Sequence, residues 1–142
     1  MDPVQAVRDT WAALLRGDLR PLEAIMTADA KWRAVEDGPW NCESRDMITK
    51  RLRQSLAEEL CGTIEEAFGV GAGVVVRFRP AHREVDGWPL DEGHRYMVIT
   101  MSDDRIVELK GCRDREDAVS YAVAHGSPVG SGVGAESEPS AL

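Results

Sequence analysis

The sequence is short of long hydrophobic runs, of cysteine and of clustered positive charge. Apolar runs such as "VVV" at 74–76 are far below the ~18 residues that a membrane-spanning helix needs. The first residues also lack the basic-then-apolar profile of a signal peptide. We therefore expect a cytoplasmic protein with no membrane partner.

The charge balance argues against nucleic acid as a partner. Lys and Arg number 17 against 25 Asp and Glu, which gives a formal net charge of −8. A chain with this charge repels a phosphate backbone, and no run of Lys and Arg exceeds two residues. Nucleic-acid binding is therefore not expected.

Metal-ligating residue types are few and scattered. Cys42, Cys61 and Cys112 form neither a CxxC pair nor a disulfide framework, so we expect reduced structural thiols. The three histidines form no HxH or HExxH pattern. The sequence therefore predicts no metal site and gives no reason to expect another cofactor.

The order of local patterns predicts three helices followed by a sheet, within one domain of residues 1–125. Capping residues mark helix starts at Asp2 and Ser44, and a short second helix is expected between them. Asp114 is expected to cap a final short helix, and the Gly-, Ser- and Pro-rich residues 126–142 to form a flexible tail. Alternating apolar and polar residues predict strands at 30–36, 62–69, 73–79, 94–101 and 105–112.

The ordered segments "WAALLRGDLRPL", "ADAKWRAVE", "SRDMITKRLRQSL" and "ITMSDDRIVELKGCRDREDA" resemble the nuclear transport factor 2-like superfamily, in its SnoaL-like bacterial branch. The resemblance spans residues 3 to about 124. It implies an α+β, cystatin-like cone in which three N-terminal helices pack on a strongly curved antiparallel sheet, with a short C-terminal helix. It also implies a pocket inside the cone and a homodimer formed through the outer face of the sheet.

The resemblance alone names no reaction, because this superfamily includes a steroid isomerase, polyketide cyclases, epoxide hydrolases, dehydratases and non-catalytic binders. Placing the chain against the isomerase pattern puts the isomerase's tyrosine at Thr10 and its two aspartates at Ala34 and Met97. All three catalytic side chains are lost, so steroid isomerisation by that mechanism is not expected.

Alternation assigns one face of the sheet to the inside of the cone. The inward side chains would be Trp32, Ala34, Glu36, Val74, Val76, Phe78, Met97, Ile99, Met101, Val107, Leu109 and Gly111. The candidate ligand contacts are Trp11, Trp32, Trp40, Val74, Val76, Phe78, Met97, Ile99, Met101 and Leu109. Such an apolar wall either binds a small hydrophobic molecule or simply fills a core, and the pattern fits both interpretations.

The charged residues expected on that face are the candidates for catalysis, namely Glu36, Glu66 and Arg95. A carboxylate in an apolar cone would have a raised pKa and would work as a general acid or base near neutral pH. Arg95 would stabilise an enolate or oxyanion. Two alternatives are open, a buried or rim salt bridge, or a strand shifted by one residue so that Glu65 points inward.

Other polar residues are expected away from the pocket. His94 and Tyr96 belong to the outer face of their strand, where burial in a dimer is the simpler role. In the helix after Ser44, Lys50, Arg51 and Arg53 are expected to form a solvated face.

These patterns support one leading hypothesis and one alternative. The leading hypothesis is a cone that binds a small hydrophobic, polyketide- or terpenoid-like molecule and isomerises, cyclises or dehydrates it without a cofactor. The alternative is a non-catalytic ligand-binding or protein-interaction protein with the same fold.

Overall fold

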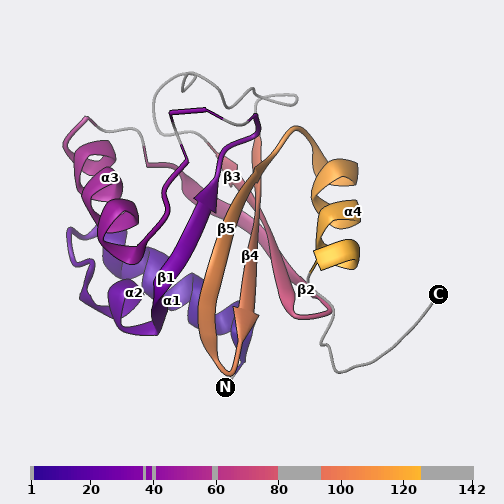
Figure 1. The fold of residues 1–142 in the computed structure, drawn as a ribbon, viewed down its shortest axis with the longest axis horizontal. Coiled ribbons are helices and arrows are strands. Elements are labelled where there is room, and N and C mark those ends of the chain that lie inside the picture. The colour runs from indigo at the N-terminus through magenta and orange to yellow at the C-terminus, as the bar shows by residue number, and fades with distance from the viewer. Residues whose placement is uncertain (1, 37, 40, 59–60, 80–93, 126–142) are drawn as a thin grey trace.

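A computed structural model describes residues 2–36, 38–39, 41–58, 61–79 and 94–125 of the chain (Figure 1). The described helices are α1 (Pro3–Leu15), α2 (Arg20–Ile25), α3 (Arg45–Ala57) and α4 (Arg115–His125). The described strands are β1 (Met26–Arg33), β2 (Thr63–Val70), β3 (Gly73–Arg79), β4 (Arg95–Ser102) and β5 (Arg105–Cys112). The predicted α+β class and the predicted order of elements are confirmed. Two sequence-based predictions, the flexible tail and the ligand contact Trp40, lie outside the described residues.

The helix starts follow from local capping, as predicted. The Asp2 carboxylate accepts a hydrogen bond from the Val4 backbone N–H at 3.0 Å, and the Ser44 hydroxyl accepts one from Met47 at 3.3 Å. A third cap begins α4, where the Asp117 backbone N–H donates a hydrogen bond of 2.7 Å to the Asp114 carboxylate. Each cap satisfies an N–H group that the first helical turn leaves without an intrahelical partner.

The five strands form one mixed sheet in the order β1-β5-β4-β3-β2. β2–β3 and β4–β5 are antiparallel hairpins, and β3 pairs antiparallel with β4. β1 instead runs parallel to β5, so the sheet that was expected to be antiparallel is mixed at this edge. Alternation indicates which face a side chain takes, but it carries no information on the direction of the neighbouring strand.

The β4–β5 hairpin turns through two adjacent acidic residues. Asp103 and Asp104 both have positive φ, 52° and 63°. This backbone is typical of the two-residue turn whose twist matches that of the flanking strands, and Asp tolerates it better than most side chains. The turn fixes the register in which Met97, Ile99 and Leu109 share one face of the sheet.

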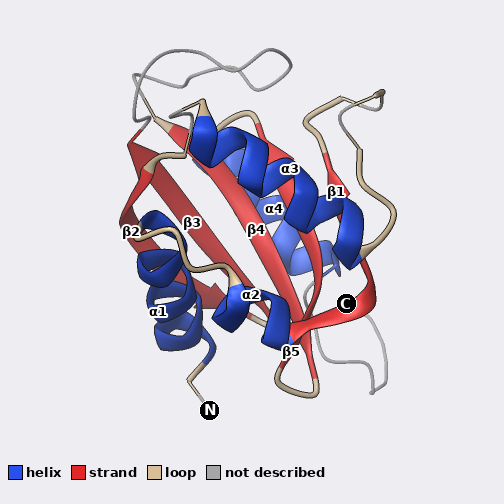
Figure 2. Ribbon diagram, turned by 90° about the vertical axis from the view of Figure 1, so that its left-hand side faces the viewer, coloured by secondary structure: helices blue, strands red, loops and turns tan. Residues whose placement is uncertain are grey.

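Helices cover both faces of the sheet (Figure 2). α1, α2 and α3 lie over one face, here called the inner face, and α4 lies over the opposite, outer face. Small side chains let α4 approach closely, because Ala118 and Ala122 are fully buried under it. A Cβ added at Gly73 would lie 3.5 Å from that of Ala122 and 3.3 Å from Val98 Cγ1, so the space there is already filled.

The apolar side chains accordingly divide into two buried clusters. The outer cluster joins α4 to the sheet through Val75, Tyr96, Val98, Cys112, Ala118 and Ala122. The larger inner cluster joins the three N-terminal helices to the other side of the same strands. Within the described residues, no helix is long and apolar enough to cross a membrane.

Candidate functional site

The inner face of the sheet is the candidate site, and its apolar wall lies where alternation placed it. Eight predicted wall residues are buried in the inner cluster, namely Trp32, Val74, Val76, Phe78, Met97, Ile99, Met101 and Leu109. Ile48 and Leu52 of α3 and Leu14 of α1 pack over them from the helix layer. The placement of these residues is confirmed, and their role as ligand contacts stays a prediction.

Half-buried apolar residues border this cluster. Trp11, Leu56, Cys61 and Ile64 pack against it while remaining partly accessible to solvent. Two contacts hold the Trp11 indole in place. Its indole Nε1 donates to the Gly62 carbonyl at 2.7 Å, and its ring lies 5.0 Å from that of Phe78 at an interplanar angle of 53°.

Trp32 forms the wall at the β1 side of the cluster. Its backbone N–H and C=O both pair with Cys42, each at 2.9 Å, which folds the segment after β1 back along the strand. The Arg51 guanidinium lies 4.9 Å from the centre of the Trp32 ring, and its Nη1 lies 3.9 Å from Cys42 Sγ. Burial raises the pKa of the Cys42 thiol and lowers the pKa of Arg51.

Arg51 was expected on the solvated face of its helix, and for this residue the expectation is wrong. It follows Ile48 by three positions, so it flanks the buried stripe of α3 rather than opposing it. Its long apolar stem and planar head let it cover the Trp32 ring. An i, i+3 relationship to a core residue is the sequence signal that identifies this position.

Arg95 lies on the inner face, as predicted. Its Cα pairs with that of Phe78 in the β3–β4 ladder, and it shares the alternation of Met97. The residue is 3% exposed, and among the described residues it is the only charged side chain that is buried. The structure therefore places one guanidinium group against an otherwise apolar wall.

Glu66 lies on the outer face, so its predicted inward position is wrong. Ile64 pairs with Phe78 but Glu66 pairs with Arg77, so β2 carries one extra residue at this point. Beyond the bulge, each side chain of β2 lies on the face opposite to the one that strict alternation from Ile64 would give. Ile64 packs in the inner cluster, whereas Phe68 packs in the outer one. The Glu66 carboxylate meets Arg115 of α4 at 2.5 Å.

Glu36 is also away from the wall. β1 ends at Arg33, so alternation no longer fixes where Glu36 points. Its side chain is 73% exposed and pairs with Arg113 at 3.1 Å. Ala34 is likewise beyond the strand, where its N–H donates to the Asn41 side chain at 2.8 Å. The expected acid/base pair of Glu36 and Glu66 is therefore not assembled on the inner face.

A second bulge accounts for the remaining error on the inner face. Thr100 pairs with Glu108 but Met101 pairs with Ile106, so Val107 is the extra residue of β5. Ile106 is fully buried in the inner cluster in place of the predicted Val107.

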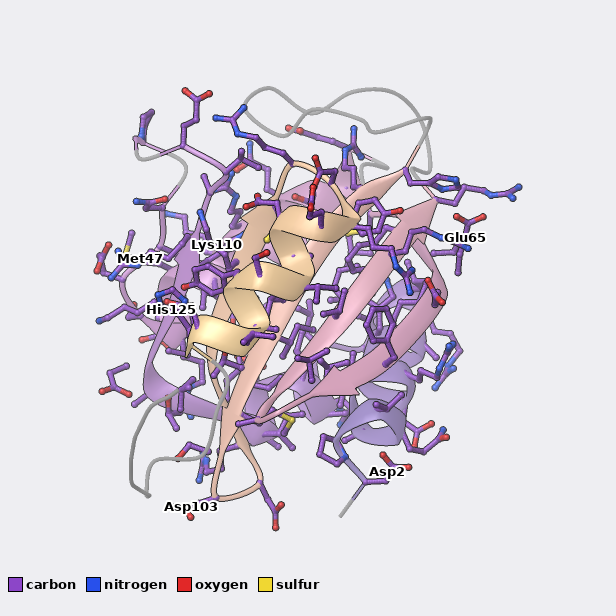
Figure 3. The ribbon with its side chains drawn as sticks, turned by 90° about the vertical axis from the view of Figure 1, so that its right-hand side faces the viewer. Asp2, Met47, Glu65, Asp103, Lys110 and His125 are labelled. Carbon is purple, nitrogen blue, oxygen red and sulfur yellow. The ribbon has the colours of Figure 1, made fainter. Side chains whose placement is uncertain are left out.

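The alternative in which Glu65 points inward is not realised either. Glu65 Oε2 lies 2.8 Å from Arg79 Nη2, and Glu65 Oε1 lies 2.7 Å from His94 Nδ1 (Figure 3). The hydrogen bond from Arg79 holds the pKa of the Glu65 carboxyl below its usual value. Tyr96 packs in the outer cluster, so the predicted outward face of this strand is confirmed.

The described residues contain no group of three or more His, Cys, Asp or Glu side chains that could hold a metal ion. The three cysteines are free thiols. Burial raises the pKa of Cys61 to about 11 and that of Cys112 to about 12, so both thiols are protonated at neutral pH.

Solved structures with the same architecture decide the fold. An uncharacterised cystatin-fold protein from Novosphingobium aromaticivorans matches with a TM-score of 0.63 and 22% identity, over 80% of this chain and 99% of its own. The chain has the cystatin-like fold. The resemblance drawn from the sequence is thus confirmed at the level of the fold.

Two further structures with this cystatin-like fold carry different functional descriptions. A proposed polyketide cyclase from Sinorhizobium meliloti matches with a TM-score of 0.59 and 20% identity, over 78% of this chain and 94% of its own. An LEH-like epoxide hydrolase from M. tuberculosis matches with a TM-score of 0.59 and 16% identity, over 87% and 90%. No family model and no curated protein matches the sequence. At these identities the comparisons establish the fold alone, and the function has to be inferred from the residues of the site.

Proposed function

We propose that this protein binds a small apolar molecule on the inner face of its cystatin-like cone. The observation that carries the proposal is the position of the wall. Side chains from β3, β4 and β5 present one continuous apolar surface to the helix layer, bordered by half-buried residues such as Trp11 and Ile64. Apolar walls with a few polar groups are typical of small-molecule sites, and the thioethers of Met97 and Met101 adapt readily to a ligand's shape.

The proposal is binding rather than turnover. The activities named for the similar structures, cyclisation and epoxide hydrolysis, are reactions in which protons move. Both carboxylates expected to serve in this role, Glu36 and Glu66, pair with arginines away from the wall. Among the described residues, no carboxylate and no imidazole is buried. A non-catalytic ligand-binding protein is thus the better supported of the two hypotheses.

The homodimer expected through the outer face stays a prediction. The position of α4 limits the part of that face that a partner could contact. α4 covers parts of β3, β4 and β5 on that face, so a partner would contact α4 itself or the outer side of β2. Light scattering coupled to size-exclusion chromatography reports the mass directly. A monomer at every concentration would contradict the expectation.

The binding proposal is tested by thermal shift and calorimetry with a panel of uncharged apolar molecules, such as medium-chain alcohols and terpenoids. We expect at least one to raise the unfolding temperature in a concentration-dependent manner, because it binds the folded state only. Ile64→Thr places a hydroxyl at the inner cluster and should weaken binding. Val70→Thr makes a matched change on the same strand but beside the outer cluster, and should leave affinity unchanged.

Failure of every ligand to shift the unfolding temperature would overturn the proposal. Equal effects of Ile64→Thr and Val70→Thr on affinity would show that the ligand does not occupy the inner face.

A further inference from the structure

We infer that Thr49 makes the polar contact with the ligand, and that the ligand is an uncharged apolar molecule with one hydrogen-bond acceptor, such as a ketone oxygen. This inference rests on the proposed function and adds a specificity-determining residue and the chemical class of the ligand. It is carried by a buried hydroxyl group, on a helix that covers the inner face, for which the described residues supply no hydrogen-bond partner.

The first step is the position of Thr49 on α3, which lies across the inner face of the sheet (Figure 2). The residue is 3% exposed, and it precedes Leu52 by three positions and Leu56 by seven, so all three share one side of the helix. Leu52 is buried in the inner cluster, and Leu56 is one of the half-buried residues that border it. Thr49 is therefore buried on the side of α3 that packs against this cluster and its border.

The second step is the hydroxyl group itself. Within the described part of the chain, Thr49 Oγ1 is buried and has no hydrogen-bond partner. Thr10, the other threonine that is buried in a described helix, instead donates to the carbonyls of Ala6 at 2.8 Å and Val7 at 3.1 Å. Burial of a hydroxyl without a partner is unfavourable, and valine would fill the same space without that loss. A threonine at this position therefore indicates a hydrogen bond to a group from outside the chain.

The third step is the kind of group that fits the Thr49 hydroxyl. Leu52 and Leu56 on the same side of α3 are apolar, so they cannot offset the burial of a ligand charge. Arg45, one turn earlier, donates instead to the Met26 carbonyl at 3.3 Å. A ketone oxygen is uncharged and accepts the one hydrogen bond that a hydroxyl donates. An apolar molecule with one such oxygen therefore satisfies Thr49 while its body lies on the apolar wall.

Two ligands of the same ring size test the inference: cycloheptanone, which carries a ketone oxygen, and cycloheptane, which carries none. Calorimetry measures the affinity of each for the unmodified protein and for Thr49→Val. This substitution keeps the shape of the side chain and removes the hydroxyl, so cycloheptanone should bind about tenfold more weakly. The affinity for cycloheptane should stay the same within about twofold, because it makes no hydrogen bond to either protein.

Two further variants separate the Thr49 hydroxyl from its surroundings. Thr49→Ser keeps a hydroxyl at the same position and should retain most of the affinity for cycloheptanone. Thr100 carries a buried hydroxyl that likewise finds no partner among the described residues, but it shares the outward alternation of Val98 in β4. Thr100→Val should therefore leave both affinities unchanged.

Urea unfolding without ligand supplies a second measurement. Thr49→Val removes a hydroxyl that makes no hydrogen bond to the described chain, so the urea midpoint should stay the same or rise. Thr10→Val removes a hydroxyl that does make one, so its midpoint should fall. A fall for Thr49→Val as large as that for Thr10→Val would show that the Thr49 hydroxyl is bonded within the folded chain, and would overturn the inference.

The outcomes separate the two proposals. If no molecule of the uncharged apolar panel binds, the proposed function fails and this inference with it. If panel molecules bind but cycloheptanone does not, the proposed function stands and the inference is overturned. The same holds if Thr49→Val changes the affinities for cycloheptanone and cycloheptane by equal factors.

Discussion

Glu66 lies opposite Arg77 in the β2–β3 ladder, with its carboxylate 3.7 Å from Arg77 Nη1 and on the same side of the sheet as α4. One extra residue in β2 produces this arrangement. Without the bulge, the alternation that places Ile64 inside would place Glu66 inside as well. A single inserted residue thus decides whether this acid belongs to a candidate site or to a surface ion-pair network.

We predict that Glu66→Gln and Glu36→Gln leave ligand affinity unchanged within about twofold, because both carboxylates lie away from the inner face. Their ion pairs are partly or largely exposed, and exposed pairs contribute about 0–1 kcal/mol to the free energy of unfolding. Titration with the uncharged ligand of the thermal-shift panel measures the affinity, and urea unfolding measures the stability.

Ile64→Thr serves as the positive control in the same titration, since it alters the inner cluster directly. A loss of affinity in either glutamine variant, comparable with that of Ile64→Thr, would show that the replaced carboxylate contributes to ligand binding and would contradict the prediction.

The elements of this fold were predictable because their signals are local. Asp2, Ser44 and Asp114 each cap a helix through a side chain within three residues of the N–H groups that they satisfy. The walls of β3 and β4 were predictable for the same reason, since a continuous period-two pattern fixes which side chains share a face. The inner-face position of Arg95 followed from that pattern, with no tertiary information needed.

The errors fall where tertiary partners decide the backbone. Glu65 and Glu66 are adjacent and identical, so the sequence does not indicate which of them is the extra residue of the bulge. Only their ion pairs with Arg77 and Arg79 show that both carboxylates lie on the outer side of the sheet. The error at Val107 has the same cause. Ile106 and Val107 are equally apolar, and only the register with β4 places Ile106 rather than Val107 on the inner face. Bulges insert a residue without changing local composition, so the sequence pattern does not indicate them.

Tyr121 anchors α4 to the sheet, and we predict that Tyr121→Phe lowers the free energy of unfolding by about 1–2 kcal/mol. Its phenol donates a hydrogen bond to the Glu108 carboxylate of β5. Burial, together with this hydrogen bond, raises the pKa of the phenol, so it is the neutral donor at physiological pH. The ring itself packs in the outer cluster and is retained by phenylalanine.

Urea unfolding of Tyr121→Phe, Glu108→Gln and the double variant closes a thermodynamic cycle around this bond. The coupling energy should be favourable, and the double variant should lose less than the sum of the single losses. Additive losses would show that the contact contributes nothing beyond the separate packing of the two side chains.

The buried thiols predict a loss of stability on the alkaline side. Burial raises the pKa of Cys61 to about 11, and burial with nearby Asp117 raises the pKa of Cys112 to about 12, against the usual thiol value of 9.0. The folded state therefore holds these protons more tightly than the unfolded chain does. Their contribution is complete below the unfolded pKa and is lost as the pH rises from about 9 toward the folded values.

Each thiol contributes at most about 1.4 kcal/mol of lost stability per pH unit in that window. Urea midpoints measured under reducing conditions at pH 8 and pH 10 should fall for the unmodified protein. They should fall less for Cys61→Ala and for Cys112→Ala, and least when both are replaced. Tyr121 adds a loss of the same sign above about pH 10, since its folded pKa is also raised. An unchanged pH dependence in the double variant would mean that the thiols are ionised as readily in the folded chain as in the unfolded one.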